Sequence, residues 1–441
     1  MTSKKRYTEA FVWIWLPQET SPVIAGRLRH SGDTLVFNYG KSYLGRPDVI
    51  AIYDPELPLQ GGELPLPNGL TMPGCIRDAA PDAWGRRVIL NRLSASTGLA
   101  QANELVFLLE SGSDRVGALD FQYSASVYEP RVSTNATLDE LLDSAARVEK
   151  GIPLTAELDQ ALFHGTSIGG ARPKALIESN NKKYIAKFSM SSDIYSLVKA
   201  EFLAMRLGKL AGLNVAPVSL THSAHRDVLL VERFDRVLAD EGWQRKSMVS
   251  ALTLFGLDEM MARYASYEIF AELIRQRFTH APATLKELFA RIVFNILTGN
   301  TDDHARNHAA FWDGKMLSLT PAYDICPQSR TGNEASQAML IQGENRMSRI
   351  STCLAAAHHF LLSSEQALEI ITGQIRTIGE NWRSVCDEAN VSEVDRRLLW
   401  GRAFLNPYAF ENLEGSDVNM AELANTFRRH GAARFPRRGA T

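Results

Sequence analysis

The sequence predicts an α+β protein with two lobes, a β-rich one followed by a larger, mostly helical one. Three observations support this prediction. Short apolar runs separated by turn formers dominate the first 70 residues, and two alternating segments, 173–178 and 183–188, flank a Ser-Asn-Asn-Lys turn. Helical periodicity prevails after residue 241. We therefore expect a small N-terminal α+β domain at 1–128, a helical linker at 129–164, a β-rich lobe at 165–240 and a helical lobe at 241–441.

The composition narrows the class of protein. The 48 basic and 50 acidic residues give a net charge of −2, which provides no general attraction for nucleic acid or membranes. The four cysteines are far apart in the sequence, so we expect free thiols rather than a disulfide framework. No stretch approaches the roughly 18 apolar residues of a membrane helix, and the apolar run at 10–16 is typical of a strand rather than a signal peptide. We therefore expect a cytoplasmic protein without a membrane partner.

The clearest predicted helix spans residues 284–298. Its large apolar residues follow the i, i+3, i+4, i+7 spacing of one helix face. Thr284 and Glu287 have the spacing of a capping box, and Gly299 directly follows the last apolar residues. The polar sequence that comes next therefore starts at a defined helix end.

That polar sequence, N-T-D-D-H-A-R-N, carries the most specific chemistry. Asp302 and Asn307 have the D-x-x-x-x-N spacing with which protein kinases supply a base and a metal ligand. Asp324 follows a predicted hairpin, where a second metal carboxylate is expected. Turn and cap roles are the alternative for each of these residues. His304 and His308 have no third zinc ligand nearby, so we interpret His304 as bracing the loop beside the nucleotide.

A glycine-rich segment, G-T-S-I-G-G-A-R-P-K, opens the first strand of the β-rich lobe. Successive backbone N–H groups in such a segment can form an anion nest, so Ser167, Gly169 and Gly170 are candidate phosphate-binding residues. The segment does not fit the Walker pattern, and it precedes a hairpin rather than a helix. An ordinary turn is the alternative.

Two further signals follow along the chain. Lys187 lies among apolar β residues, and Glu201 follows fourteen residues later on an amphipathic helix, as in the lysine–glutamate pair that holds nucleotide phosphates in kinases. An unrelated surface lysine and glutamate are the alternative. Glu232, Arg233 and Phe234 end the last strand before the helical lobe, where a kinase hinge contacts adenine. The order of loop, lysine, glutamate, hinge, base and metal aspartate predicts a protein-kinase-like fold that uses ATP and Mg²⁺.

Several motifs together resemble the HipA-type serine/threonine kinases, the toxins of two-gene type II toxin–antitoxin modules. In the lobes these motifs are S-I-G-G-A-R-P-K, Y-I-A-K-F, V-E-R-F-D-R, T-D-D-H-A-R-N and L-T-P-A-Y-D-I. Further upstream, R-D-A-A-P-D-A-W-G-R-R and S-G-S-D-R-V-G-A-L resemble the N-terminal domain of that family. The resemblance covers roughly residues 8–390.

The resemblance implies roles for individual residues. Those expected to handle ATP and Mg²⁺ are the base Asp302, the Mg²⁺ ligands Asn307 and Asp324, the phosphate-binding Lys187 and the adenine-contacting residues 232–234. Ser167 would match the inhibitory autophosphorylation serine of the family. Asp303 is a departure at one position of the family motif, where both glycine and aspartate are tolerated. No catalytic role is expected for it.

The resemblance also implies partners. These are a small helix-turn-helix antitoxin of the HipB type, operator DNA reached only through that antitoxin, and a protein substrate such as an aminoacyl-tRNA synthetase. Two alternatives stay open. One is a phosphotransferase for small molecules, against which the extra N-terminal domain argues. The other is a catalytically weak co-repressor scaffold for a DNA-binding antitoxin, against which the intact Lys187, Asp302, Asn307 and Asp324 argue.

Overall fold

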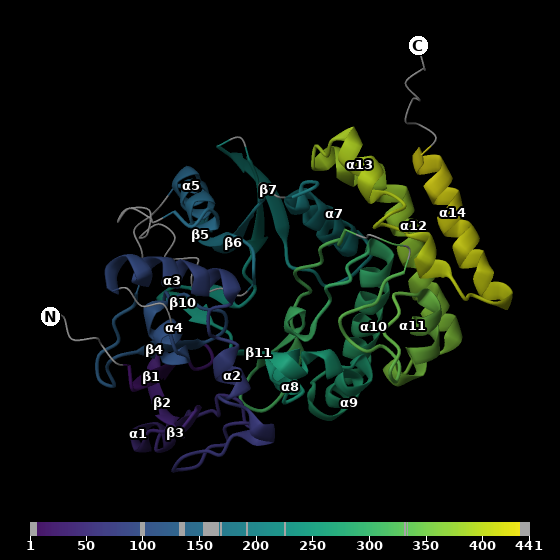
Figure 1. Ribbon diagram of the computed structural model, residues 1–441. Helices are drawn as coiled ribbons and strands as arrows, with labels where there is room; N and C mark the ends of the chain where they lie inside the picture. The colour runs from purple at the N-terminus through teal and green to yellow at the C-terminus, as the bar shows by residue number, and fades with distance from the viewer. Residues whose placement is uncertain are drawn as a thin grey trace. The chain divides into compact units, whose positions relative to one another are not determined.

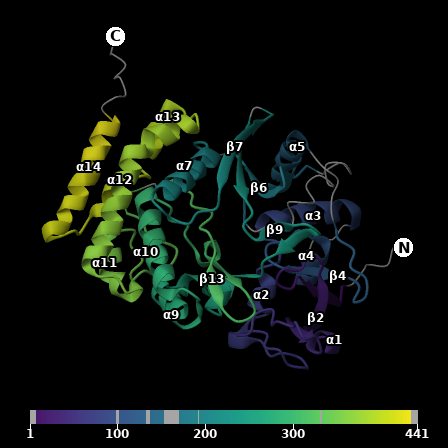
Figure 2. The ribbon, with the colours of Figure 1, turned by 180° about the vertical axis from the view of Figure 1, so that it is seen from behind.

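The computed structural model describes residues 7–97, 102–131, 137–152, 167, 170–190, 193–224, 226–329, 332 and 334–432. The chain forms two compact units, which Figures 1 and 2 show from opposite sides. Unit 1 comprises Met1–Ser191, Thr221–Asp258 and Ala309–Leu317, and unit 2 comprises Ser192–Leu220, Glu259–His308 and Ser318–Thr441. Each unit is therefore assembled from segments that are distant in sequence.

The N-terminal part of unit 1 is built on an antiparallel sheet of order β3-β2-β1-β4. Its strands are β1 (Glu9–Ile14), β2 (Val23–Ser31), β3 (Thr34–Tyr39) and β4 (Leu119–Gln122). The first three confirm the strands predicted from the short apolar runs. The helices of unit 1 are α1 (Lys41–Leu44), α2 (Gly74–Arg77), α3 (Ala83–Thr97), α4 (Glu104–Glu110), α5 (Leu138–Glu149) and α8 (Ala251–Leu254).

A second sheet, of order β5-β6-β8-β7, follows in the chain. Its strands are β5 (Lys174–Ser179), β6 (Lys182–Phe188), β7 (Val218–Ser223) and β8 (Arg226–Glu232). Asn180 and Asn181 both have positive φ, the conformation of a two-residue hairpin turn, which confirms the predicted β5–β6 hairpin. Side chains of this sheet share one buried cluster with α3 and α5, formed around Trp84, Leu142 and Phe188. The hairpin and the N-terminal helices therefore stabilise each other.

Five short strands lie at or beyond the end of the predicted β-rich lobe. They are β9 (Arg236–Ala239), β10 (Gly242–Arg245), β11 (Met248–Ser250), β12 (Ala309–Trp312) and β13 (Leu317–Leu319). They form a β10-β9 hairpin and a sheet of order β11-β12-β13. The expectation of helices almost throughout this region was incomplete, because strands of three or four residues are too short to display a period of two.

Unit 2 is mostly helical, although residues 241–258 and 309–317 of the predicted helical lobe belong to unit 1. Its helices are α7 (Leu197–Leu210), α9 (Tyr267–Arg277), α10 (Ala281–Thr298), α11 (Ile350–Ala356), α12 (Ser364–Glu388), α13 (Glu393–Leu399) and α14 (Val418–Ala432). The central α10 packs against α9, α11 and α12. Within the described part of the chain, no helix has the length and apolar character required to cross a bilayer.

The start of α10 differs from the prediction. The helix begins at Ala281, three residues before the presumed cap, with Pro282 in its first turn. The Thr284 N–H donates to the carbonyl of His280 (2.9 Å), so Thr284 lies inside the helix. Glu287 instead pairs with Arg291 one turn later (2.8 Å). The capping-box prediction was wrong because a proline, which suits the first turn, extends the helix upstream.

The end of α10 is as predicted. Gly299 caps the helix in the left-handed conformation, with φ of 70°. A Cβ atom at this position would lie 2.8 Å from the carbonyl oxygen of Ala403. Glycine is therefore required by both the conformation and the close packing, and it fixes where the following loop leaves the helix.

Candidate active site

The segment that follows α10 folds back on itself. The N–H of His304 donates to the carbonyl of Asp302 (2.9 Å), and the N–H of Asn307 donates to the carbonyl of His304 (2.8 Å). The side-chain Nδ2 of Asn307 also donates to the carbonyl of Asp302 (3.0 Å). Because its nitrogen is used in this way, the amide oxygen of Asn307 is the group that can face a cation. We call residues 302–307 the DDHARN loop.

Asp324 lies close to the DDHARN loop in unit 2. The hydroxyl of Tyr323 donates to the carbonyl of Arg306 (2.8 Å), which fastens this segment to the loop. Asp324 has a φ of 60°, a left-handed conformation that a non-glycine residue adopts at some cost in free energy. The structure thus brings the predicted metal aspartate to the loop that carries the predicted base.

Asp302 lies in the electrostatic field of Asp324. Asp302 is exposed overall, yet partial burial raises the pKa of its carboxyl group. His304 acts in the opposite direction, whereas the negative charges of Asp324 and Asp303 raise that pKa further. Because Asp324 is a proposed metal ligand, a cation bound there would offset the rise that its charge causes.

The donor set fits Mg²⁺ rather than zinc. Carboxylate and amide oxygens of Asp324 and Asn307 are hard ligands, and Mg²⁺ commonly takes one or two such protein ligands and completes its shell with water and phosphate oxygens. Among the residues that the structure describes, no group of three or more His, Cys, Asp or Glu side chains is arranged for a metal ion. His304 has a buried Nδ1 atom without a hydrogen-bond partner in that part of the chain. The predicted bracing role of His304 stays a prediction.

The predicted phosphate-binding lysine has a second lysine beside it. Lys187 on β6 is paired directly with Lys174 on β5, and Lys174 is buried. A Cβ atom on Gly170 would lie 2.2 Å from the Lys174 ammonium, so only glycine permits this approach. Both lysines also have polar or electrostatic partners of their own. The sequence places Lys174 at the end of the glycine-rich segment, but its position opposite Lys187 depends on the strand register.

Two described residues of the glycine-rich segment, Ser167 and Gly170, bond to the N-terminal part of unit 1. The buried hydroxyl of Ser167 donates to the carbonyl of Asp114 (3.2 Å). The N–H of Gly170, which we expected to face phosphate, donates to a carboxylate oxygen of Asp82 (2.6 Å). The third candidate, Gly169, lies outside the described residues. A phosphate-binding role for this segment stays a prediction.

The predicted hinge segment is held at each of its three residues. The carboxylate of Glu232 pairs with Lys182 on β6 (2.7 Å). The N–H of Arg233 donates to the carbonyl of Lys183 (2.8 Å), so this donor is already used within the sheet. The ring of Phe234 lies edge-on to an aromatic ring of β12. Contact of this segment with adenine is untested by this geometry.

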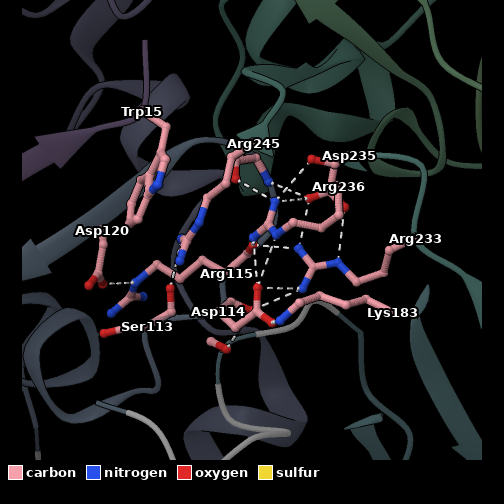
Figure 3. A network of polar contacts seen from close by, with 12 residues as sticks. Trp15, Ser113, Asp114, Arg115, Asp120, Lys183, Arg233, Asp235, Arg236 and Arg245 are labelled. Atoms are coloured by element: carbon pink, nitrogen blue, oxygen red, sulfur yellow. Dashed lines mark hydrogen bonds and ion pairs between the residues drawn. The ribbon is translucent and has the colours of Figure 1, made fainter. Parts of the chain in front are cut away.

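A buried ionic network, drawn in Figure 3, surrounds the side chain of Arg233. Asp114 pairs with Arg233 (2.9 Å), Arg236 (2.9 Å) and Lys183 (2.8 Å). Asp235 pairs with the same two arginines, at 2.8 and 2.9 Å. These links join the S-G-S-D-R-V-G loop of the N-terminal part to the V-E-R-F-D-R segment. Both motifs are evident in the sequence, but nothing in the sequence predicts that they meet.

The network keeps its carboxylates ionised. Burial by itself would raise the pKa of Asp114, but Arg233, Arg236 and Lys183 hold it well below its ordinary value. Burial likewise opposes ionisation of Asp235, and the two arginines lower its pKa to about 2. The charges are therefore present throughout the physiological pH range.

The predicted lysine–glutamate pair spans the two units. Lys187 lies on β6 of unit 1, and Glu201 is buried on α7 of unit 2. Each of these residues has polar or electrostatic partners of its own. Their pairing stays a prediction.

Two family models match the chain. A model of the HipA N-terminal domain matches residues 15–122, and a model of the HipA-like C-terminal domain matches residues 166–382. The chain belongs to the HipA family. The two matches contain the ionic network and the DDHARN loop, so the sites described above lie in family domains.

Curated relatives carry kinase names. The chain is 25% identical over 260 residues to the serine/threonine-protein kinase toxin HipA of Shewanella oneidensis, a match that spans 54% of this chain and 59% of that protein. It is 29% identical over 182 residues to a putative kinase of Haemophilus influenzae, spanning 36% of this chain and 52% of that protein. These matches thus cover little more than half the length of either relative.

A solved structure matches nearly the whole HipA-family chain. This is the Shewanella oneidensis HipA chain in a complex with HipB and its operator DNA, with a TM-score of 0.65 at 20% identity over 96% of both chains. The likeness confirms the α+β, two-lobed kinase-like fold that the order of motifs predicts.

Proposed function

We propose that this HipA-family chain is an ATP–Mg²⁺-dependent serine/threonine protein kinase that acts as the toxin of a toxin–antitoxin module. The observation that carries the proposal is the DDHARN loop fastened against the segment of Asp324. This arrangement puts the carboxylate of Asp302 beside two oxygen ligands suited to Mg²⁺. The kinase toxin name of the Shewanella relative supports it.

The chemistry would divide between the two units. In unit 2, Asp302 would accept the proton of the attacking serine or threonine hydroxyl. The hydroxyl oxygen would bond to the γ-phosphorus of ATP as ADP leaves. Asn307 and Asp324 would hold Mg²⁺, which when bound offsets the charge of the phosphates. In unit 1, the ammonium groups of Lys187 and Lys174 would bind phosphate oxygens, and residues 232–234 would contact adenine.

Transfer of label from γ-³²P-ATP tests this proposal. We expect Mg²⁺-dependent labelling of serine or threonine in protein, and no labelling of small alcohols such as aminoglycosides. Labelling of small molecules alone would favour the alternative phosphotransferase. Absence of transfer to any acceptor, with candidate synthetases and the chain itself supplied, would contradict the kinase proposal.

The partners belong to the same proposal. We infer that a small helix-turn-helix antitoxin binds the chain and carries it to operator DNA. The solved Shewanella HipA is held in a complex with HipB and operator DNA, and the net charge of −2 offers no general affinity for DNA by itself. An aminoacyl-tRNA synthetase is the substrate that the family resemblance favours, since its modification would inhibit translation.

The metal ligands can be tested separately from the base. We expect Asn307→Ala and Asp324→Ala each to weaken ATP binding in the presence of Mg²⁺ by about tenfold or more, and to change Mg²⁺-free binding little. The reason is that their oxygens act on the nucleotide only through the cation. Calorimetric titrations with and without Mg²⁺ measure the difference. Equal losses under both conditions would contradict the assignment.

Ser167 provides a proposed means of self-inhibition. In this structure its hydroxyl is buried against the carbonyl of Asp114, so it must leave this position before it can be phosphorylated. A phosphate would add about −1.5 to −2 charges in a segment proposed to receive the phosphates of ATP, and the phosphate oxygens could not donate to the carbonyl of Asp114 as the hydroxyl does. The modified segment would therefore not return to its place, and ATP binding would weaken.

Mass spectrometry after incubation with ATP and Mg²⁺ checks this proposal. We expect phosphate on Ser167 in the wild-type chain and none in the Asp302→Asn variant, because the same base would serve both reactions. The phosphorylated chain should bind ATP at least tenfold more weakly than the unmodified chain. Unchanged ATP affinity in a homogeneously phosphorylated sample would rule out the inhibitory role.

A further inference from the structure

A buried histidine–carboxylate pair links a residue of the DDHARN loop to the residue that directly follows the loop. The Nε2 atom of His308 is 2.8 Å from a carboxylate oxygen of Asp303, and both side chains are almost fully buried. The hydroxyl of Tyr267, on α9, donates to Asp303 and lies 3.0 Å from the same His308 nitrogen. The rings of Tyr267 and Phe270 stand edge-on to the imidazole. The pair is thus enclosed by α9 in unit 2.

The pair repeats the spacing of the proposed functional residues. Asp303 follows the base Asp302, and His308 follows the metal ligand Asn307, so both pairs are five residues apart. Asp302 is exposed whereas Asp303 is buried, which places the two carboxylates on opposite sides of the backbone. His308 has extended backbone angles and directly follows Asn307, so its buried side chain and the partly exposed side chain of Asn307 point in different directions. Each exposed or partly exposed functional residue, Asp302 and Asn307, is therefore joined by a peptide bond to a buried residue, Asp303 and His308 respectively.

We propose that Asp303 and His308 are positioning residues that fix both ends of the DDHARN loop and so set the distance between Asp302 and Asn307. Asp303 anchors the end that carries the base, and His308 anchors the end that carries the metal ligand. Their direct contact, and the Tyr267 hydroxyl that lies close to both, hold the two ends of the loop together. The inference rests on the proposed kinase function of the same site.

A purely structural ion pair is the alternative explanation. Removing one partner of a buried pair destabilises a protein because the other partner is left without compensation, while replacing both partners by apolar groups costs little. Stability and activity therefore separate the two explanations. If the pair is purely structural, stability and activity should fall together when one partner is removed and recover together when both are replaced. If the pair positions the loop, replacing both partners should restore stability but not activity.

The test compares Asp303→Ala, His308→Phe and the double variant in the full-length chain. Both single variants should have a lowered melting temperature, and the double variant should recover part of it, since the buried Tyr267 hydroxyl still loses its Asp303 acceptor. In all three we expect kcat for phosphoryl transfer to fall about 10- to 100-fold, as for residues that orient metal ligands, with KM for ATP changed less than about threefold. A double variant that recovers wild-type kcat along with its melting temperature would overturn the proposal.

A matched control exists in the same unit. His359 forms a similar contact with Glu268, at 2.7 Å, but both side chains are partly exposed and lie outside the loop. His359→Phe should leave kcat within about twofold of wild type, because exposed pairs contribute little. A fall in kcat equal to that of His308→Phe would mean that any lost histidine pair slows this protein, and the proposal would be abandoned.

Hydrogen exchange supplies a readout that does not depend on activity. The amides of His304 and Asn307 are hydrogen-bonded within the loop, so they should exchange at least tenfold faster in Asp303→Ala and in the double variant. Amides of α12 should be unchanged in the double variant. If the wild-type chain transfers no phosphate, the kinase proposal fails, but accelerated exchange would still support the positioning role. Unchanged exchange at both amides would contradict it whatever the activity.

Discussion

Replacing Asp302 with asparagine is expected to lower the rate of phosphoryl transfer by about 10²- to 10⁴-fold, the range of general acid–base catalysis. The amide is nearly the same size as the carboxyl group but cannot accept the proton of the attacking hydroxyl. Because the hydrogen bonds that shape the loop use the backbone carbonyl of Asp302, the loop should keep its form. ATP binding should therefore change little, which single-turnover assays and calorimetry on the same sample can measure.

Asp33→Asn is a suitable control for this variant. Asp33 is exposed in the turn between β2 and β3, so the same chemical change there should leave transfer unaffected. Wild-type turnover in Asp302→Asn would refute the assignment of the base. Loss of ATP binding comparable to the loss of rate would instead indicate that Asp302 acts on the nucleotide or its metal ion.

Removing the carboxylate of Asp114 is expected to destabilise unit 1 by about 3–5 kcal/mol, the cost of breaking a buried ion pair. Asp114→Ala removes one of the two carboxylates that pair with the buried Arg233 and Arg236 in the described part of the chain, and leaves Asp235 as the other. Urea unfolding followed by hydrogen exchange can separate the units. Protection of β4 in unit 1 should be lost at lower urea concentration, while protection of α12 in unit 2 should not change.

Asp48→Ala provides the comparison for Asp114→Ala. Asp48 pairs with Arg46 at 2.7 Å on the surface, where solvent weakens the interaction, so no resolvable change in unfolding is expected. Equal effects of the two substitutions would show that burial of the Asp114 network adds nothing to the stability of unit 1.

The same network should make unit 1 sensitive to acid. An aspartate in the unfolded chain has a pKa of about 3.9. In the folded chain the pKa of Asp235 is about 2, and the pKa of Asp114 also lies well below its ordinary value. A lowered folded-state pKa contributes stability above the unfolded value, and this contribution is lost as pH falls through the folded value. The free energy of unfolding should therefore fall below about pH 4, and less steeply in Asp114→Ala than in wild type.

Local patterns in the sequence were sufficient to predict several secondary-structure elements and the candidate catalytic residues of this protein. Asp302 and Asn307 are five residues apart in one loop, so their spacing alone contains most of the geometry that relates them. The β5–β6 hairpin was likewise predictable, because a two-asparagine turn between alternating segments fixes its register. The order of these local motifs along the chain predicted the kinase-like fold.

Helix boundaries were less well determined by local patterns. A capping box requires only two residues three apart, so Thr284 and Glu287 match it by chance in the first turns of α10. Pro282 fits the first turn equally well, and the hydrogen bond from the Thr284 N–H to His280 decides between the two starts. Several weak terminus signals can coexist, and packing selects among them.

Only the tertiary structure decided which distant residues share a network. Asp114 meets Arg233 across 119 positions of sequence, because residues of the N-terminal loop and the end of β8 are buried together in unit 1. Asp303 meets Tyr267 only because α9 covers the loop, and Lys174 faces Lys187 only in the observed register. Periodicity records which side of an element is buried, but it does not record what that side is buried against. The sequence by itself thus determined the order of motifs and the candidate base, whereas burial and topology determined the anchors that hold them.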